Sequence, residues 1–264
     1  MRIPIRMIDI ATTFFWTFLI AFSVSAVYSV KDIHFDFGQP QIEVTPDNKI
    51  IFSQLMSITN KGFYNIGSFN ISTEVADKEG FTITRGFTFT LVINKNDTVT
   101  VTHNMTIDIN DLLQQNKNYL FNDTELKIYE KVGLSIAEVI PVQGSANFSM
   151  PWGAPLYNFT LGTPEFAPLI IPGSTARYRV TVPMSFENHA FFDLTGTVQV
   201  RMYNSTNVLI GEEQDAMEAR QDSSYHESLE FYIPATHLTI DGHFEVFFAT
   251  PFFNYGPLVV PYGR

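Results

Sequence analysis

The chain of 264 residues contains no cysteine. This absence excludes disulfide bonds, thiolate nucleophiles and cysteine-ligated metal ions. The sequence also has no glycine-rich phosphate loop and no G-x-S-x-G nucleophile elbow. We therefore expect a protein that is not an enzyme and that carries no cofactor.

The histidines and acidic residues show no metal-binding spacing. Only His237 and His243 lie near one another among the six histidines, and their separation fits neither a strand pair nor a helix pair of ligands. Glu212, Glu213 and Asp215 lack the spacing of a calcium-binding loop, so we expect a solvated acidic face. No pair of carboxylates is identified that would serve a glycosidase.

Charge is absent from Ile10 to Val30, a run of 21 residues. A helix of this length spans about 31 Å, which matches the hydrocarbon core of a bilayer. Arg2 and Arg6 precede the run, and this excess of arginine places the N-terminus in the cytoplasm. The sequence predicts a single-pass membrane protein anchored by residues 10–30, with the C-terminal part extracytoplasmic.

A cleavable signal peptide is the alternative. Ser23–Ala26 offers small residues to a signal peptidase after a short apolar core. The apolar run continues through Val27, Tyr28 and Val30, which makes it long enough to span and favours retention. Cleavage after Ala26 stays open at this point.

The part of the chain beyond the anchor is acidic. Without Arg2, Arg6 and Asp9 it keeps 14 of the 16 basic and 26 of the 27 acidic residues, a net charge of −12. Such a surface repels nucleic acid and anionic lipid headgroups, so we expect no nucleic-acid partner. The charge keeps an exported domain soluble.

Seven Asn-x-Ser/Thr sequons indicate a glycoprotein. An exported glycoprotein without cysteine points to an archaeal cell envelope, because extracellular animal and plant proteins of this size usually carry disulfides. The candidate glycosylation sites are Asn70, Asn96, Asn104, Asn122, Asn147, Asn158 and Asn204.

An internal repeat indicates two tandem domains. Met56–Ile66 parallels Met184–Leu194 at an offset of 128 residues without a gap. Finding such a repeat first prevents a single-domain interpretation. We predict an anchor over residues 1–30, a first domain over 31–157 and a second over 158–264.

Within each half, apolar residues alternate with polar ones. Residues 81–93 place aromatic or aliphatic residues between threonines, which is typical of half-buried strands. Turn signals separate these runs, at Asp77–Gly80, Pro172–Gly173 and Asp241–Gly242. The pattern predicts a mainly β protein with two antiparallel β-sandwiches.

Three further expectations concern individual segments. Asn110–Asn116 has an N-cap and helix formers, so it predicts a short helix. The apolar tail from Phe252 to Tyr262 predicts the last strand. We expect Trp152 and the phenylalanines of residues 81–93 to lie in the core, with an exposed binding platform as the alternative.

Several of these segments together resemble the late-embryogenesis-abundant group-2 domain, also called the WHy domain. The resemblance covers most of residues 35–264 and rests on Ile58–Phe63, Asp77–Gly80, residues 86–90, Ile109, Leu112, Leu113, Pro151–Gly153, Asn188 and Gly211–Glu212. It implies membrane-anchored, non-catalytic domains and transfers no catalytic residue. The Asn-Pro turn of the family is absent, since Lys61 follows Asn60 and His189 follows Asn188, so an immunoglobulin-like or fibronectin-like sandwich stays open.

The leading hypothesis is a non-enzymatic, membrane-tethered structural or interaction protein of the cell envelope. Its expected partners are the membrane, through residues 10–30, and other envelope or membrane proteins, and a homo-oligomer is open. One alternative is a filament or surface-layer subunit, released by cleavage after Ala26, that donates residues 27–45 as a strand. Another is an enzyme or carrier for envelope glycans or lipids.

Overall fold

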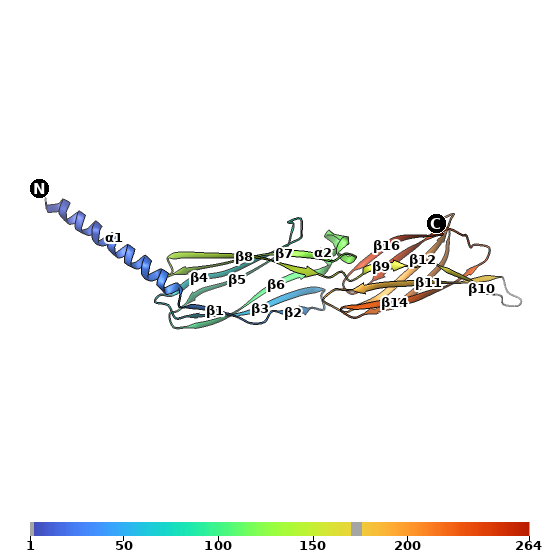
Figure 1. The fold of residues 1–264 in the computed structure, drawn as a ribbon, viewed down its shortest axis with the longest axis horizontal. Coiled ribbons are helices and arrows are strands. Elements are labelled where there is room, and N and C mark those ends of the chain that lie inside the picture. Colours follow the sequence, from blue (N-terminus) through green and yellow to red (C-terminus); the bar gives the residue numbers. More distant parts are fainter. Residues whose placement is uncertain (1–2, 170–175, 264) are drawn as a thin grey trace. The chain divides into compact units, whose positions relative to one another are not determined.

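A computed structural model describes residues 3–169 and 176–263, with side chains from Thr12 onward (Figure 1). Within these residues one long helix precedes sixteen strands. The predicted turn at Pro172–Gly173 lies outside the described residues. The first eight strands are β1 (Ile33–Phe37), β2 (Gln41–Val44), β3 (Lys49–Asn60), β4 (Ile66–Ala76), β5 (Thr82–Ile93), β6 (Thr98–Asp108), β7 (Thr124–Ile136) and β8 (Ile140–Trp152). The last eight are β9 (Tyr157–Leu161), β10 (Glu165–Leu169), β11 (Arg177–Asn188), β12 (Leu194–Asn204), β13 (Leu209–Ala219), β14 (Ser223–Pro234), β15 (Gly242–Ala249) and β16 (Asn254–Tyr262).

Helix α1 (Ile3–Val30) contains the predicted apolar run. Its segment Thr12–Val30 is long and apolar enough to cross a membrane, and only 11% of that segment is buried. Phe14, Trp16 and Phe18 are more than half exposed, at 74%, 57% and 62%. A helix of a soluble core would bury these rings. Apart from its C-terminal end, the described part of the helix therefore lacks the protein contacts of a core helix.

The strand order of the first eight strands recurs in the last eight. In the first set, β3 pairs with β1, β2 and β6, and a second sheet has the order β5-β4-β7-β8. In the second set, β11 pairs with β9, β10 and β14, and the other sheet has the order β13-β12-β15-β16. Met56–Ile66 joins β3 to β4, and Met184–Leu194 joins β11 to β12. The sequence repeat therefore coincides with a repeat of topology.

The chain divides into two compact units. The first comprises Met1–Glu43, Ile50–Ile107 and Lys127–Ser149, and the second comprises Val44–Lys49, Asp108–Leu126 and Met150–Arg264. The segment between β6 and β7 thus belongs to the second unit. The predicted domain limits, 31–157 and 158–264, stay predictions.

The two sheets of the first unit bury a common core. Figure 1 shows β4, β7 and β8 in one layer and β1, β3 and β6 in the other. Ile58 of β3 and Phe69 and Ile71 of β4 are fully or almost fully buried in one cluster. Ala26 of α1 belongs to the same cluster, at 2% exposure. The end of the helix is therefore part of the core of the first unit.

The short predicted helix is present, but it begins earlier than expected. Helix α2 spans Ile109–Gln115, and its N-cap is Asp108, whose carboxylate accepts a hydrogen bond from the Asp111 amide at 3.1 Å. The sequence favoured Asn110 as the cap. Ile109 is completely buried, so burial of this side chain sets the start of the helix. A 3-10 helix, η1 (Lys117–Leu120), follows.

The orientation of β5 contradicts the sequence expectation. Phe87, Phe89 and Leu91 face solvent, with exposed fractions of 67%, 51% and 70%. The inward face of β5 approaches β6 closely: Thr84 Oγ1 donates to the Thr106 carbonyl at 2.6 Å. A Cβ atom on Gly86 would lie 2.8 Å from the Asn104 carbonyl oxygen. A phenyl ring does not fit there, so threonine and glycine face inward.

Two other expectations are confirmed. Trp152 is 1% exposed, and its indole N–H donates to the Tyr119 carbonyl at 3.0 Å. The C-terminal segment forms β16, which pairs with β15 at the end of its sheet. Trp152 therefore serves packing, whereas the exposed phenylalanines of β5 do not.

Candidate functional site

The turn after β3 is built around one buried asparagine. Asn60 is completely buried, and its Nδ2 donates to the carbonyls of Tyr64 at 2.9 Å and Ile93 at 3.2 Å. Its Oδ1 accepts a hydrogen bond from the Gly62 amide at 3.1 Å. One side chain therefore satisfies three backbone groups that the turn leaves unpaired.

Asn188 repeats this arrangement after β11. Its Nδ2 donates to the carbonyls of Phe192 at 2.9 Å and Ala219 at 3.0 Å, and its Oδ1 accepts from the Ala190 amide at 3.1 Å. Asn188 is also completely buried. The Asn turns noticed in the sequence thus have the same hydrogen bonds in both halves.

The backbone amide of the residue after each asparagine binds the segment that precedes the first strand of that half. The Lys61 amide donates to the Asp32 carbonyl at 2.9 Å, and the His189 amide donates to the Ala154 carbonyl at 3.0 Å. Proline has no amide hydrogen and could make neither bond. A proline at either position would therefore lose a hydrogen bond that the structure makes.

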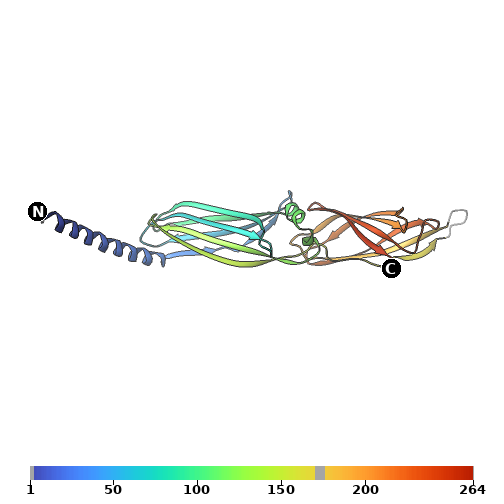
Figure 2. The same ribbon diagram turned by 90° about the horizontal axis from the view of Figure 1, so that it is seen from above.

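The C-terminal end of α1 is seated on the first of these turns. Ser29 is 1% exposed, and its Oγ accepts a hydrogen bond from the Phe63 amide at 2.8 Å. The Ser25 hydroxyl lies 2.6 Å from the Tyr64 hydroxyl, and the Phe22 ring meets the Tyr64 ring edge to face at 5.5 Å. We call Ser25, Ala26, Ser29, Gly62 and Tyr64 the helix seat. Figure 2 shows the ribbon of α1 leading into the strands of the first unit.

Gly62 fits the helix seat because it has no side chain. A Cβ atom there would overlap Ser29 Oγ and would lie 2.7 Å from the Ser29 carbonyl oxygen. The corresponding residue of the second repeat is Ala190, which carries a Cβ atom. Glycine is therefore required where a helix end packs on the turn.

The helix seat includes the predicted cleavage site. Ser23–Ala26 is helical, and Ala26 is buried. Peptidases act on accessible, locally flexible segments. Ala26 is thus buried in the folded first unit, whereas Val27 on the other side of the bond is 72% exposed.

His189 joins three parts of the second unit. Its Nδ1 lies 2.7 Å from Asp123 Oδ2, its Nε2 lies 3.0 Å from Glu187 Oε2, and its ring stacks on Tyr157 at 4.4 Å. Asp123 also accepts a hydrogen bond from the Ala154 amide at 2.8 Å. The hydrogen bond to Asp123, with help from Glu187, raises the pKa of His189 above its usual value of 6.5 against the effect of burial. His189 therefore connects Asp123, before β7, with Glu187 of β11 and Tyr157 of β9.

The interior of the first unit contains a histidine among threonines. His103 is 9% exposed, and its ring nitrogens lie 2.9 Å from the hydroxyls of Thr73 and Thr88. Burial lowers the pKa of His103 below 6.5. The two hydroxyls satisfy a neutral imidazole, so the arrangement is structural.

Glu130 is the residue that sequence reasoning missed. It stands in the inward row of β7, a row otherwise apolar, in which Ile128 precedes it and Val132 follows it. No hydrogen bond or ion pair to its carboxylate is found in the described part of the chain. Burial raises the pKa of Glu130 above its usual value of 4.5. The signal in the sequence was a lone acid interrupting an alternating apolar row.

Glu130 lines a cavity of about 460 Å³ at one flank of the first unit. We call this cavity the lateral groove. Its lining comes from β1, β3, β7 and β8 and includes Phe37, Gln54, Val132, Gly144 and Phe148. The groove combines apolar walls with one convergent acid, which is typical of a binding site.

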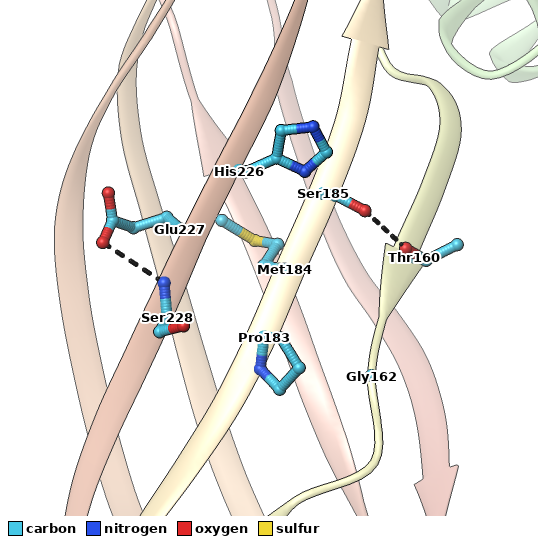
Figure 3. Close-up of a pocket in the computed structure, with 8 residues that line it drawn as sticks. All are labelled: Thr160, Gly162, Pro183, Met184, Ser185, His226, Glu227 and Ser228. Atoms are coloured by element: carbon cyan, nitrogen blue, oxygen red, sulfur yellow. Dashed lines mark hydrogen bonds between the residues drawn. The ribbon is translucent and has the colours of Figure 1, made fainter.

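A second depression, of about 470 Å³, lies on the outward face of β9, β11 and β14 (Figure 3). Thr160 and Ser185 share a hydrogen bond of 2.8 Å across it. Glu227 turns back to accept from the Ser228 amide at 3.2 Å. These groups satisfy one another and converge on no common point, so we assign them no ligand.

The sequons differ in their accessibility. Five asparagines are exposed and stay predicted glycosylation sites: Asn96, Asn104, Asn122, Asn147 and Asn158. Asn70 is half-buried, and its Nδ2 donates to the Ser68 carbonyl at 2.9 Å. Asn204 is 8% exposed, and its Nδ2 donates to the His237 carbonyl at 3.3 Å. Because the fold uses this amide, we do not propose a glycan at Asn204.

The other polar residues of interest in the sequence do not come together. Glu212 accepts a hydrogen bond from Arg201 Nε at 3.1 Å on an exposed strand, and His243 stacks on Tyr203 at 4.9 Å. Among the described residues, no three histidine, aspartate or glutamate side chains are placed to hold a metal ion.

No protein-family model matches this chain, and no curated protein matches it significantly. Among solved structures, the C-terminal domain of the Streptococcus agalactiae antigen I/II polypeptide BspA is 9% identical, with a TM-score of 0.42, over 88% of this chain and 100% of its own. The C-terminal domain of the Streptococcus pyogenes antigen I/II-family protein AspA is 8% identical, with a TM-score of 0.41, over 88% and 99%. Red sea bream transglutaminase is 11% identical, with a TM-score of 0.31, over 88% of this chain, which spans only 31% of that enzyme. At this level of similarity none of them bears on the function of this chain.

Proposed function

We propose that this chain is a non-enzymatic, membrane-tethered protein of the cell envelope. Its two tandem sandwiches, of immunoglobulin-like or WHy-like type, would lie outside the cytoplasmic membrane and contact other envelope or membrane proteins. The observation that carries the proposal is the helix seat, in which the end of an apolar helix is built into the first unit.

The helix seat favours retention of the anchor over cleavage. Cleavage after Ala26 would remove a buried member of the core cluster and the hydroxyl of Ser25 that contacts Tyr64. It would leave Ser29 without the helix that positions it. A segment destined for removal would not be expected to contribute to the core.

Charge and sequon positions support the orientation. Arg2 and Arg6 precede the apolar run, and five exposed sequons follow it. The alternative of a released strand-donating subunit has less support. Its donor segment includes β1, which already pairs with β3 of the same chain from Ile33 opposite Asn60 to Phe37 opposite Met56.

Single cysteines test the orientation directly, because the natural chain has none. We expect a membrane-impermeant maleimide to label Ser205→Cys, on an exposed turn, in intact cells. Ile3→Cys should react only after the membrane is opened. Labelling of Ile3→Cys in intact cells, with Ser205→Cys protected, would contradict the proposed topology.

A further inference from the structure

We infer that the lateral groove of the first unit binds an extended segment of a partner protein. This segment would add a strand to β8 and place a lysine or arginine beside Glu130. The inference deepens the proposed function, on which it rests, by naming the chemistry of the partner that the exported sandwich contacts.

The edge formed by β8 is open to such a strand. β8 is the last strand of its sheet, and its 13 residues include no charged side chain. Residues 141–149 are exposed on both faces of the strand, and a partner strand would add to chains that carry no glycan at the predicted site Asn147. Natural sheets usually protect a long edge with charges, prolines, bulges or a covering segment, and the prolines of β8 stand only near its two ends, at Pro141 and Pro151. An unprotected edge offers backbone donors and acceptors to an added strand.

The groove beside this edge has room for the side chains of an added strand. Its volume is about 460 Å³, and Val132 forms part of its wall. Phe37 and Phe148 also line it, yet they remain 54% and 50% exposed. An apolar side chain that entered the groove would cover these two rings and remove apolar surface from water.

Glu130 gives the groove its charge preference. Its carboxylate has no hydrogen bond or ion pair in the described part of the chain. The groove that it lines is mainly apolar, and Gln54 and Ser145 are its other polar residues. A desolvated carboxylate is stabilised by a cation that pairs with it. The net charge of −12 beyond the anchor also attracts basic partners and repels acidic ones.

In the second unit, the flank between β9 and β16 corresponds to the lateral groove, and side chains of the same chain fill it. There, Phe121 packs against Phe159 of β9 at 6.5 Å and against Tyr255 of β16 at 5.2 Å. Lys117 lies over the Tyr255 ring at 5.6 Å. An aromatic side chain and a cation from outside the sheets thus close this flank. The first unit lacks such a covering segment within its described residues.

The geometry disfavours a second copy of the chain as the occupant. Two β8 strands related by a two-fold axis would pair antiparallel. Ile140, at the start of β8, packs against the same core cluster as Ala26 of α1. The two anchors would therefore leave from opposite ends of the pair, which prevents both from entering one membrane.

The test uses the full chain in lipid nanodiscs and a fluorescein-labelled peptide, VTFTKTV, read by fluorescence anisotropy. A second peptide carries glutamate and a third carries glutamine in place of the lysine. We expect the lysine peptide to bind at least about tenfold more tightly than the glutamate peptide, because the latter brings a second negative charge to Glu130.

Two pairs of variants locate the binding. Gly144→Leu should abolish binding without unfolding the chain, since a Cβ atom at Gly144 meets no atom within 4 Å. Gln143→Leu, the neighbouring change outside the cavity lining, is its control. Glu130→Gln should weaken only the lysine peptide, whereas Glu125→Gln, on an exposed part of the same strand, should change nothing.

Three results would overturn the inference. One is equal binding of the lysine peptide to the natural chain and to Gly144→Leu. Another is occupation of the groove by a fluorescent fatty acid while no peptide binds. The third is dimerisation of the natural chain that Gly144→Leu prevents. Peptide binding does not depend on retention of the anchor, so failure here is distinguishable from failure of the proposed tethering.

Discussion

Phe87 and Phe89 illustrate how far alternation in a sequence can be used. The period of two in residues 81–93 predicts a strand, and β5 is there. The period does not tell which face is buried, because either set of residues can point inward. Because β6 lies close to β5, the small residues Thr84, Gly86 and Thr88 face inward and the phenylalanines face solvent.

The exposed position of Phe87 makes a sharp prediction. Phe87→Thr should change the free energy of unfolding by less than about 0.5 kcal/mol, as expected for a surface substitution. Phe69→Ala, in the core of the same unit, should cost about 3–5 kcal/mol. Denaturant unfolding of both variants compares them, and a large cost for Phe87→Thr would place the ring in the core.

Glu130 is predicted to reduce the stability of the first unit at neutral pH. Its folded pKa is raised above 4.5, so its contribution to stability is full below pH 4.5 and is lost as pH rises through the folded pKa. Glu130→Gln should therefore raise the melting temperature at pH 7 and have little effect at pH 4. A lower melting temperature at pH 7 would instead indicate a structural role for the carboxylate.

At the scale of elements, Gly62 tests how α1 is held. Gly62→Ala places a Cβ atom against Ser29 and should detach the end of the helix from its seat. Amide hydrogen exchange within residues 25–30 should then become faster. Gly144→Ala is the matched control, because a Cβ atom at Gly144 has no other atom within 4 Å. Unchanged exchange in Gly62→Ala would mean that the turn yields and the seat does not depend on glycine.

Elements were predicted well where the signal is local. The charge-free run gave α1, and the tail gave β16, since helix length and apolar content are properties of the sequence itself. The cap of α2 was displaced from Asn110 to Asp108 because burial of Ile109 outweighs the capping preference. The lateral groove could not be predicted, because it depends on strands far apart in the sequence.

At the scale of the whole molecule, the two units should respond to pH in opposite directions. The pKa of His189 is raised. Its contribution to the stability of the second unit is therefore full below pH 6.5 and is lost as pH rises through the folded pKa. The pKa of His103 is lowered by burial. Protonation of His103 therefore destabilises the first unit, and this destabilisation sets in as pH falls below 6.5. We expect up to about 1 kcal/mol from the partly exposed His189 pair.

Hydrogen exchange read separately for each unit between pH 5.5 and about 8 checks this expectation. Protection of the second unit should decrease with rising pH. Protection of the first unit should increase when it is measured in the Glu130→Gln variant, which removes the opposite effect of that carboxylate. His189→Gln and His103→Gln should each flatten the response of one unit only. Parallel responses of both units would show that other groups dominate.

Retention of the anchor is tested most directly by the intact mass and N-terminal peptides of the chain purified from its native membranes. We predict that a peptide spanning the bond between Ala26 and Val27 is recovered. We also predict that the chain stays in the membrane fraction after a carbonate wash. A mature chain that begins at Val27 and appears in the soluble fraction would contradict the tether.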